Sequence, residues 1–79
     1  MKIYGYKKHV NNSDELILLS EISIQTSPEK LRSIANFILK TADEIEKINY
    51  KTTSKYHSHL RDNWTDWKEE YTDVIIVSE

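Results

Sequence analysis

One stretch of the sequence decides the fold: residues 27–49, which read SPEKLRSIANFILKTADEIEKIN. Ser27 is a good helix cap, Pro28 suits the first helical position, and Glu29 stands where a negative charge meets the positive end of the helix dipole. No further glycine or proline interrupts the stretch. We therefore predict a long helix from Ser27 to about Asn49.

The apolar residues of this helix recur at spacings of three and four, which predicts one face buried on a core. They are Leu31, Ile34, Ala35, Ile38, Leu39, Ala42 and Ile45, with Phe37 and Ile48 at one margin. The acids Asp43, Glu44 and Glu46 fall on the polar side, where a solvated helix face explains them without catalytic chemistry.

Two strands are predicted before the helix. Residues 2–8 alternate loosely and are rich in Tyr and Ile, and residues 15–25 form a longer alternating run. Between them, residues 11–14 (NNSD) have the side chains that favour a turn. The two strands are expected to form an antiparallel hairpin.

After the helix, residues 50–55 form a polar connection, and residues 56–61 suit a short strand. Residues 62–71 are aromatic and acidic, with no clear structural pattern. Residues 73–78 (DVIIVS) indicate an interior strand covered on both faces. The predicted fold is a single α+β domain over residues 1–79: a small, mainly antiparallel sheet of three to four strands with one long helix packed on one face. The element order is β-β-α-β-β, or β-β-α-β if residues 56–61 are irregular.

Composition limits the class of protein. At 79 residues the chain is too short for two independent cores, and 38% hydrophobic with 30% charged residues is typical of a folded domain. The chain has no cysteine for disulfides or thiolate metal sites, which favours a cytoplasmic location. We expect no signal peptide and no membrane span. The net charge of -2 argues against a nucleic-acid partner.

A single helix covers only one face of a sheet. The other face would carry Ile17, Leu19 and one side of residues 74–77, and an uncovered apolar face is usually buried by a partner. Two interpretations stay open. Either residues 62–71 fold over this face, with Trp64 and Trp67 as a lid, or the face binds a partner, which includes a second copy in a homodimer.

The pair His57 and His59 has the spacing of two metal ligands on one face of a strand. Asp62, Asp66 or Asp73 is a candidate for a further carboxylate ligand. A metal-binding module or metal-dependent hydrolase is therefore one alternative, although convergence of a third ligand is not visible. The other interpretation is hydrogen bonding from partly buried imidazoles to a carboxylate or a backbone carbonyl. We expect no cofactor.

No motif indicates an enzyme. The single glycine, Gly5, rules out a glycine-flanked serine elbow and a glycine-rich phosphate loop. Trp64 and Trp67 lie among Asp62, Asp66, Glu69 and Glu70, which suits an aromatic contact site with an acidic rim. The competing interpretation places both tryptophans in the core or in a lid.

Four features occur in order along the chain. They are MKIYGY at residues 1–6, the run from Ser27 to Leu39 followed by Ala42-Asp43-Glu44, His57-x-His59 with Asp62 after it, and DVIIV at residues 73–77. Together they resemble the Immunity protein 32 family, small bacterial proteins of polymorphic toxin systems. The resemblance implies a non-catalytic protein that binds and neutralises a cognate toxin. We expect the contact residues to be His57, His59, Asp62, Trp64, Asp66 and Trp67. A structural homo-oligomer is a further alternative.

Overall fold

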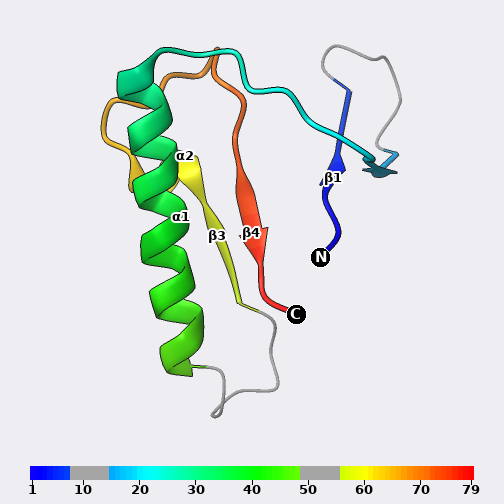
Figure 1. Cartoon of the computed structure of the whole chain (residues 1–79), viewed down its shortest axis with the longest axis vertical. Coiled ribbons are helices and arrows are strands. Elements are labelled where there is room, and N and C mark those ends of the chain that lie inside the picture. Colours follow the sequence, from blue (N-terminus) through cyan, green and yellow to red (C-terminus); the bar gives the residue numbers. More distant parts are fainter. Residues whose placement is uncertain (8–14, 49–55) are drawn as a thin grey trace.

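The computed structural model describes residues 1–7, 15–48 and 56–79 (Figure 1). In chain order the elements are β1 (Tyr4–Gly5), β2 (Ile17–Leu18), α1 (Pro28–Ile48), β3 (His57–His59), α2 (Leu60–Asn63) and β4 (Ile75–Val77). This order confirms the α+β class and the one long helix. The predicted turn at 11–14 and the polar connection at 50–55 lie outside the described residues.

The strands form two separate antiparallel pairs. β1 pairs with β2, Tyr4 opposite Leu18, and the pair is extended by a 2.8 Å hydrogen bond from the amide of Leu19 to the carbonyl of Ile3. β3 pairs with β4, His59 opposite Ile75. A single sheet of three or four strands is not confirmed, since in the described part of the chain β1 has β2 as its partner and β4 has β3.

Helix α1 begins where its capping residues predict. The backbone N–H of Lys30 donates to Ser27 Oγ at 3.3 Å, and the amide of Leu31 donates to the Ser27 carbonyl at 2.9 Å. Pro28 takes the first helical position, where its missing N–H costs no hydrogen bond. The start of the helix predicted from Ser27 and Pro28 is therefore confirmed.

The buried face of α1 differs from the predicted one. The helix buries Phe37 (3% exposed) and Thr41 (2%), and Phe37 forms the apolar core with Leu60 of α2 (1%). Leu39, in the predicted stripe, is 66% exposed. Because each residue turns the helix by about 100°, the buried face is rotated by about one residue. The reason is that the largest apolar side chain of the helix, Phe37, takes the centre of the contact.

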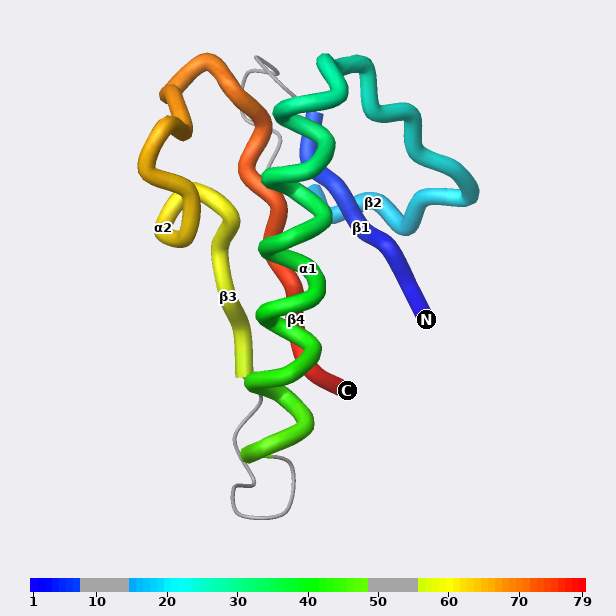
Figure 2. Tube along the Cα trace, turned by 60° about the vertical axis from the view of Figure 1, so that its left-hand side comes forward, coloured from blue at the N-terminus to red at the C-terminus, as the bar shows by residue number. Residues whose placement is uncertain are grey.

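The hairpin of β1 and β2 stands apart from the helix. Figure 1 places β3 and β4 between α1 and this hairpin, and Figure 2, turned by 60°, keeps β4 between β3 and β1. Between the hairpin and α1, residues 20–27 are all exposed. In the described ranges, no helix is long and apolar enough to cross a membrane.

Strand β4 is not covered on both faces. Ile75 is 51% exposed and Val77 is 56% exposed, and alternation places both on the same face of the β3–β4 sheet. Ile76, between them, is half-buried. The prediction of an interior strand is therefore wrong, because one of its faces remains open.

Candidate functional site

The two histidines of β3 lie side by side on one face of the strand. Their rings meet edge to face, with centroids 5.7 Å apart and planes at 77°. His57 is exposed, whereas His59 is half-buried. The strand spacing thus brings the two rings together as predicted, but it places them in different surroundings.

Asp73 holds His59 in position. His59 Nδ1 lies 2.7 Å from Asp73 Oδ2, and the backbone N–H of Arg61 donates to Asp73 Oδ1 at 3.1 Å. The guanidinium Nε of Arg61 lies 3.8 Å from Oδ2. Burial acts to raise the pKa of Asp73, but the hydrogen bonds and charges of His59 and Arg61 outweigh it and hold that pKa below its ordinary value. Asp73 is therefore an anionic clamp between β3 and the start of β4.

The hydrogen-bonding interpretation is confirmed for His59, whose partner is a carboxylate. Within residues 1–7, 15–48 and 56–79, no group of three His, Cys, Asp or Glu side chains is arranged to hold a metal ion. The nitrogen that His59 turns toward Asp73 is already engaged. The metal interpretation thus gains no geometric support from these residues.

The short helix α2 is fixed at the end of β3. The side-chain amide of Asn63 donates to the His59 carbonyl at 2.8 Å and to Ser58 Oγ at 3.2 Å, while the amide of Leu60 donates to the Val74 carbonyl at 2.8 Å. Leu60 is buried beneath this turn. Asp62 consequently points to solvent, with 67% of its side chain exposed.

Three aromatic residues form a cluster after α2: Trp64, Trp67 and Tyr71. The Trp64 and Tyr71 rings stack with centroids 5.5 Å apart at 24°, and Trp67 meets Tyr71 edge-on at 6.4 Å and 86°. Backbone turns hold the spacing, with hydrogen bonds of 3.0 Å from Trp67 to Trp64 and 2.9 Å from Tyr71 to Lys68. All three side chains are half-buried, so they are neither a closed core nor free anchors.

The aromatic cluster lies beside the first turn of α1. Lys30 Nζ of that turn sits 5.2 Å from the centroid of the Tyr71 ring, a cation–π distance. The outer face of the β3–β4 sheet stays open at Ile75 and Val77. The interpretation of Trp64 and Trp67 as a lid over that face is therefore wrong. Trp67 Nε1 is buried with no hydrogen-bond partner among the described residues.

Exposed acids flank the residues of the aromatic cluster in the sequence. Asp62, Asp66, Glu69 and Glu70 are all exposed, and Lys68 is the basic residue among them. Carboxylates in solvent beside half-buried rings form an acidic rim around an aromatic centre. We call residues 57–71 with this cluster and rim the acidic aromatic surface.

Tyr56 links helix α1 to the residues that flank β3 and β4 through hydrogen bonds. Tyr56 Oη donates to Glu44 Oε2 of α1, and this bond, ahead of desolvation, raises the pKa of the tyrosine. The amide of Tyr56 donates to Ser78 Oγ at 2.9 Å, and the amide of Ser78 to the Tyr56 carbonyl at 2.8 Å. The sequence did not single out Tyr56 or Tyr71, and it did not predict that Asp73 holds His59 in position. An antiparallel pairing of residues 56–61 with residues 73–78 would have placed Asp73 beside His59.

Comparison with known proteins gives one match. The family model described as Immunity protein 32 matches residues 21–78, which contain α1, β3, α2 and β4 and the whole acidic aromatic surface. No curated protein matches the chain, and no solved structure matches it. Because the match spans well over half of the sequence, it confirms the resemblance, and the chain belongs to the Immunity protein 32 family.

Proposed function

We propose that this protein is an immunity protein that neutralises a cognate bacterial toxin by binding it stoichiometrically, without catalysis and without a cofactor. The observation that carries the proposal is the family match over residues 21–78. We place the complex in the cytoplasm, because the chain has no cysteine and so does not depend on an oxidising compartment for disulfide bonds.

The acidic aromatic surface is the contact site that we propose. Its contact residues are His57, His59, Asp62, Trp64, Asp66 and Trp67. Half-buried tryptophans are suited to this role, because a ring already held by Tyr71 loses little side-chain entropy when a partner covers its open part. The cluster therefore supplies affinity through rigid apolar area.

The acidic rim indicates the charge of the surface that the partner presents. Asp62 and Asp66 are exposed and stand on the same segment as Glu69 and Glu70, which favours a toxin with a basic face at this contact. Complementary charge speeds the encounter and orients the two proteins more than it adds affinity. A toxin that itself binds a polyanion has such a face.

The two histidines have different parts in the complex. His59 is held by Asp73 and offers the toxin only the 22% of its side chain that is exposed, whereas His57 is exposed and free to meet the toxin directly. A specific complex of this kind buries about 1,200–2,000 Å² in total.

The experiment uses the toxin domain that the proposal places in a neighbouring gene. Co-expression of the protein with that domain should restore growth, and calorimetry with a catalytically inactive toxin should give one chain bound per toxin. Equal restoration of growth by a triple variant Asp62→Asn, Trp64→Ala, Asp66→Asn would remove this surface from the proposal. Absence of binding by the unaltered protein would refute the function itself.

A further inference from the structure

Helix α1 leaves an apolar flank open to solvent. Leu31 is 49% exposed, Ile38 46% and Leu39 66%, and Ala35 and Ala42 lie exposed among them. Leu31, Ala35, Ile38 and Ala42 follow one another at spacings of three and four, and Leu39 lies beside them, four residues after Ala35. The five residues form a continuous strip along the helix, which we call the open flank of α1. Soluble monomers seldom leave such a strip uncovered.

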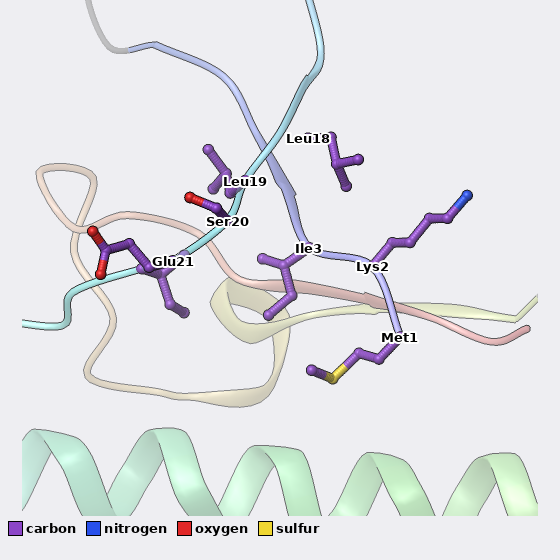
Figure 3. A pocket seen from close by; sticks show the side chains of 8 residues that line it. Met1, Lys2, Ile3, Leu18, Leu19, Ser20 and Glu21 are labelled. Carbon is purple, nitrogen blue, oxygen red and sulfur yellow. The ribbon is translucent and has the colours of Figure 1, made fainter.

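The N-terminal hairpin has an apolar surface of its own. Three apolar side chains are exposed: Ile3 just before β1 (38%), Leu18 in β2 (58%) and Ile22 after β2 (52%). They contribute to an open cavity of about 330 Å³, which Met1 also lines. Figure 3 shows the side chains of Met1 and Ile3 pointing from the hairpin toward β4 and the side of α1.

The two apolar surfaces do not meet within one chain. In Figures 1 and 3, β3 and β4 lie between the hairpin and α1. Among the described residues, the charged contact that joins the hairpin to the C-terminal strand is the N-terminal amino group of Met1, 3.8 Å from Glu79, and both side chains there are almost fully exposed. Such a contact contributes little to holding the hairpin in place.

The exposed area of the chain is larger than that of a folded monomer. The chain exposes 7275 Å² at a mass of 9.4 kDa, whereas a monomer of that mass exposes about 5,000 Å². The radius of gyration is 14.0 Å, against about 11.6 Å for a compact domain of this length. The excess of about 2,000 Å² per chain is counted over all 79 residues, including 8–14 and 49–55, and it leaves room for the roughly 800 Å² that each partner buries in a standard complex.

We infer that a second copy of this chain covers these surfaces, with the hairpin of each copy packed on the open flank of α1 of the other. Both surfaces belong to the same chain, so one two-fold interface covers both at once. The exposed segment at residues 20–27 gives the hairpin the reach for such an exchange.

Two observations favour a second copy over a toxin at this surface. Every copy carries both an apolar hairpin and an open flank, so a second copy supplies a matching surface for each of them. Charge also fits: the described residues 1–7 carry Lys2 and Lys7 without an acid, and Glu46 follows Ala42 by one helical turn at the end of the flank. The acidic aromatic surface is left free.

Sedimentation velocity on the purified full chain, without toxin, tests the inference. The expected result at micromolar concentration is a mass twice the 9.4 kDa of the chain. Leu39→Glu should raise the dimer dissociation constant about tenfold or more. Asn36→Glu adds the same charge to an exposed position of α1 outside the flank, and should leave the dimer intact. A monomeric unaltered chain overturns the inference.

The arrangement is tested separately with single cysteines, since the natural chain has none. Chains carrying Ile22→Cys and chains carrying Leu39→Cys, refolded together and oxidised, should form the mixed disulfide in excess over either like pair. The double variant in one chain, Ile22→Cys with Leu39→Cys, should crosslink between chains. A crosslink within the chain, or like pairs in excess, would overturn the exchange even if the protein is dimeric.

Discussion

His59 Nδ1 and Asp73 Oδ2 lie 2.7 Å apart, which ties strand β3 to the residues that lead into β4. The same carboxylate accepts the backbone N–H of Arg61 at 3.1 Å, so a single side chain fixes the end of the strand and the first turn of α2. Of the proposed contact residues, His59 is bonded to Asp73 directly, Asp62 lies in α2 and Trp64 follows it. The shape of the acidic aromatic surface therefore depends on Asp73.

Replacing Asp73 should destabilise the protein in a pH-dependent way. Asp73→Asn should lower the free energy of unfolding by about 1–2 kcal/mol near neutral pH, because it removes a charged hydrogen-bond acceptor. The folded-state pKa of Asp73 lies below its ordinary value. The stabilisation is thus fully present above the unfolded pKa of about 3.9 and is lost as the pH falls through the folded-state pKa.

Urea unfolding at constant protein concentration, at neutral pH and at about pH 3, measures this effect. The difference between Asp73→Asn and the unaltered protein should shrink at the lower pH. Glu21→Gln, at an exposed acid outside the clamp, should show no comparable difference. An undiminished gap at low pH would mean that the Asp73 charge does not stabilise the fold.

Replacing Phe37 should be the most damaging change in α1. The side chain is 3% exposed, so Phe37→Ala should cost about 3–5 kcal/mol through lost burial and the cavity left behind. Lys40→Ala, at an exposed position of the same helix, should stay within about 0.5 kcal/mol of the parent. Thermal and urea unfolding measure both, and similar losses in the two variants would show that the buried face is assigned wrongly.

The tryptophans and the rim acids should affect toxin binding in different ways. Trp64→Ala or Trp67→Ala should weaken binding by about 2 kcal/mol or more, mainly through faster dissociation. Because each ring also contacts Tyr71, the melting temperature should fall moderately as well. Trp64→Phe keeps the stack and should restore the melting temperature more fully than the affinity.

Asp66→Asn should instead slow association and leave stability unchanged, since its side chain is exposed. The effect should disappear at high salt, where charges more than a few ångströms apart are screened. Surface plasmon resonance with the inactive toxin at two salt concentrations measures both rates. An Asp66→Asn effect on dissociation that persists at high salt would place this acid inside the interface and not at its rim.

The purified protein should contain no stoichiometric zinc, and added zinc should leave its melting temperature unchanged. The physical reason is that, among the described residues, no third His, Cys, Asp or Glu side chain is arranged with the histidine pair to hold a metal ion. Elemental analysis and thermal melts with His57→Ala provide the measurement. One zinc per chain, lost in His57→Ala, would favour a metal-binding module.

The long helix was predictable because its signals are local. A cap at Ser27, a proline at Pro28 and a regular apolar spacing act within a few residues of one another. Which face is buried was not predictable from that spacing. It depends on where Leu60, 23 positions after Phe37 in the sequence, packs against the helix, and it places the polar Thr41 inside while Leu39 stays outside.

The site shows the same limit. The sequence placed His57 and His59 on one face of a strand and named three aspartates as candidates beside them. The choice among those aspartates follows from the pairing of His59 with Ile75, which brings Asp73 to the imidazole and leaves Asp62 in solvent. Strand register is a long-range property, so local spacing does not supply it.

Trp64 and Trp67 are the two tryptophans of the chain, and both belong to the aromatic cluster. The tryptophan fluorescence of the protein therefore comes entirely from the surface proposed to meet the toxin. Excitation of the indole rings in this protein therefore reports on that surface without an added label. The core residues Phe37 and Leu60 do not contribute to tryptophan emission. A toxin that covers the rings should shift their emission to shorter wavelength, so docking can be timed in a stopped-flow mixer with the natural sequence.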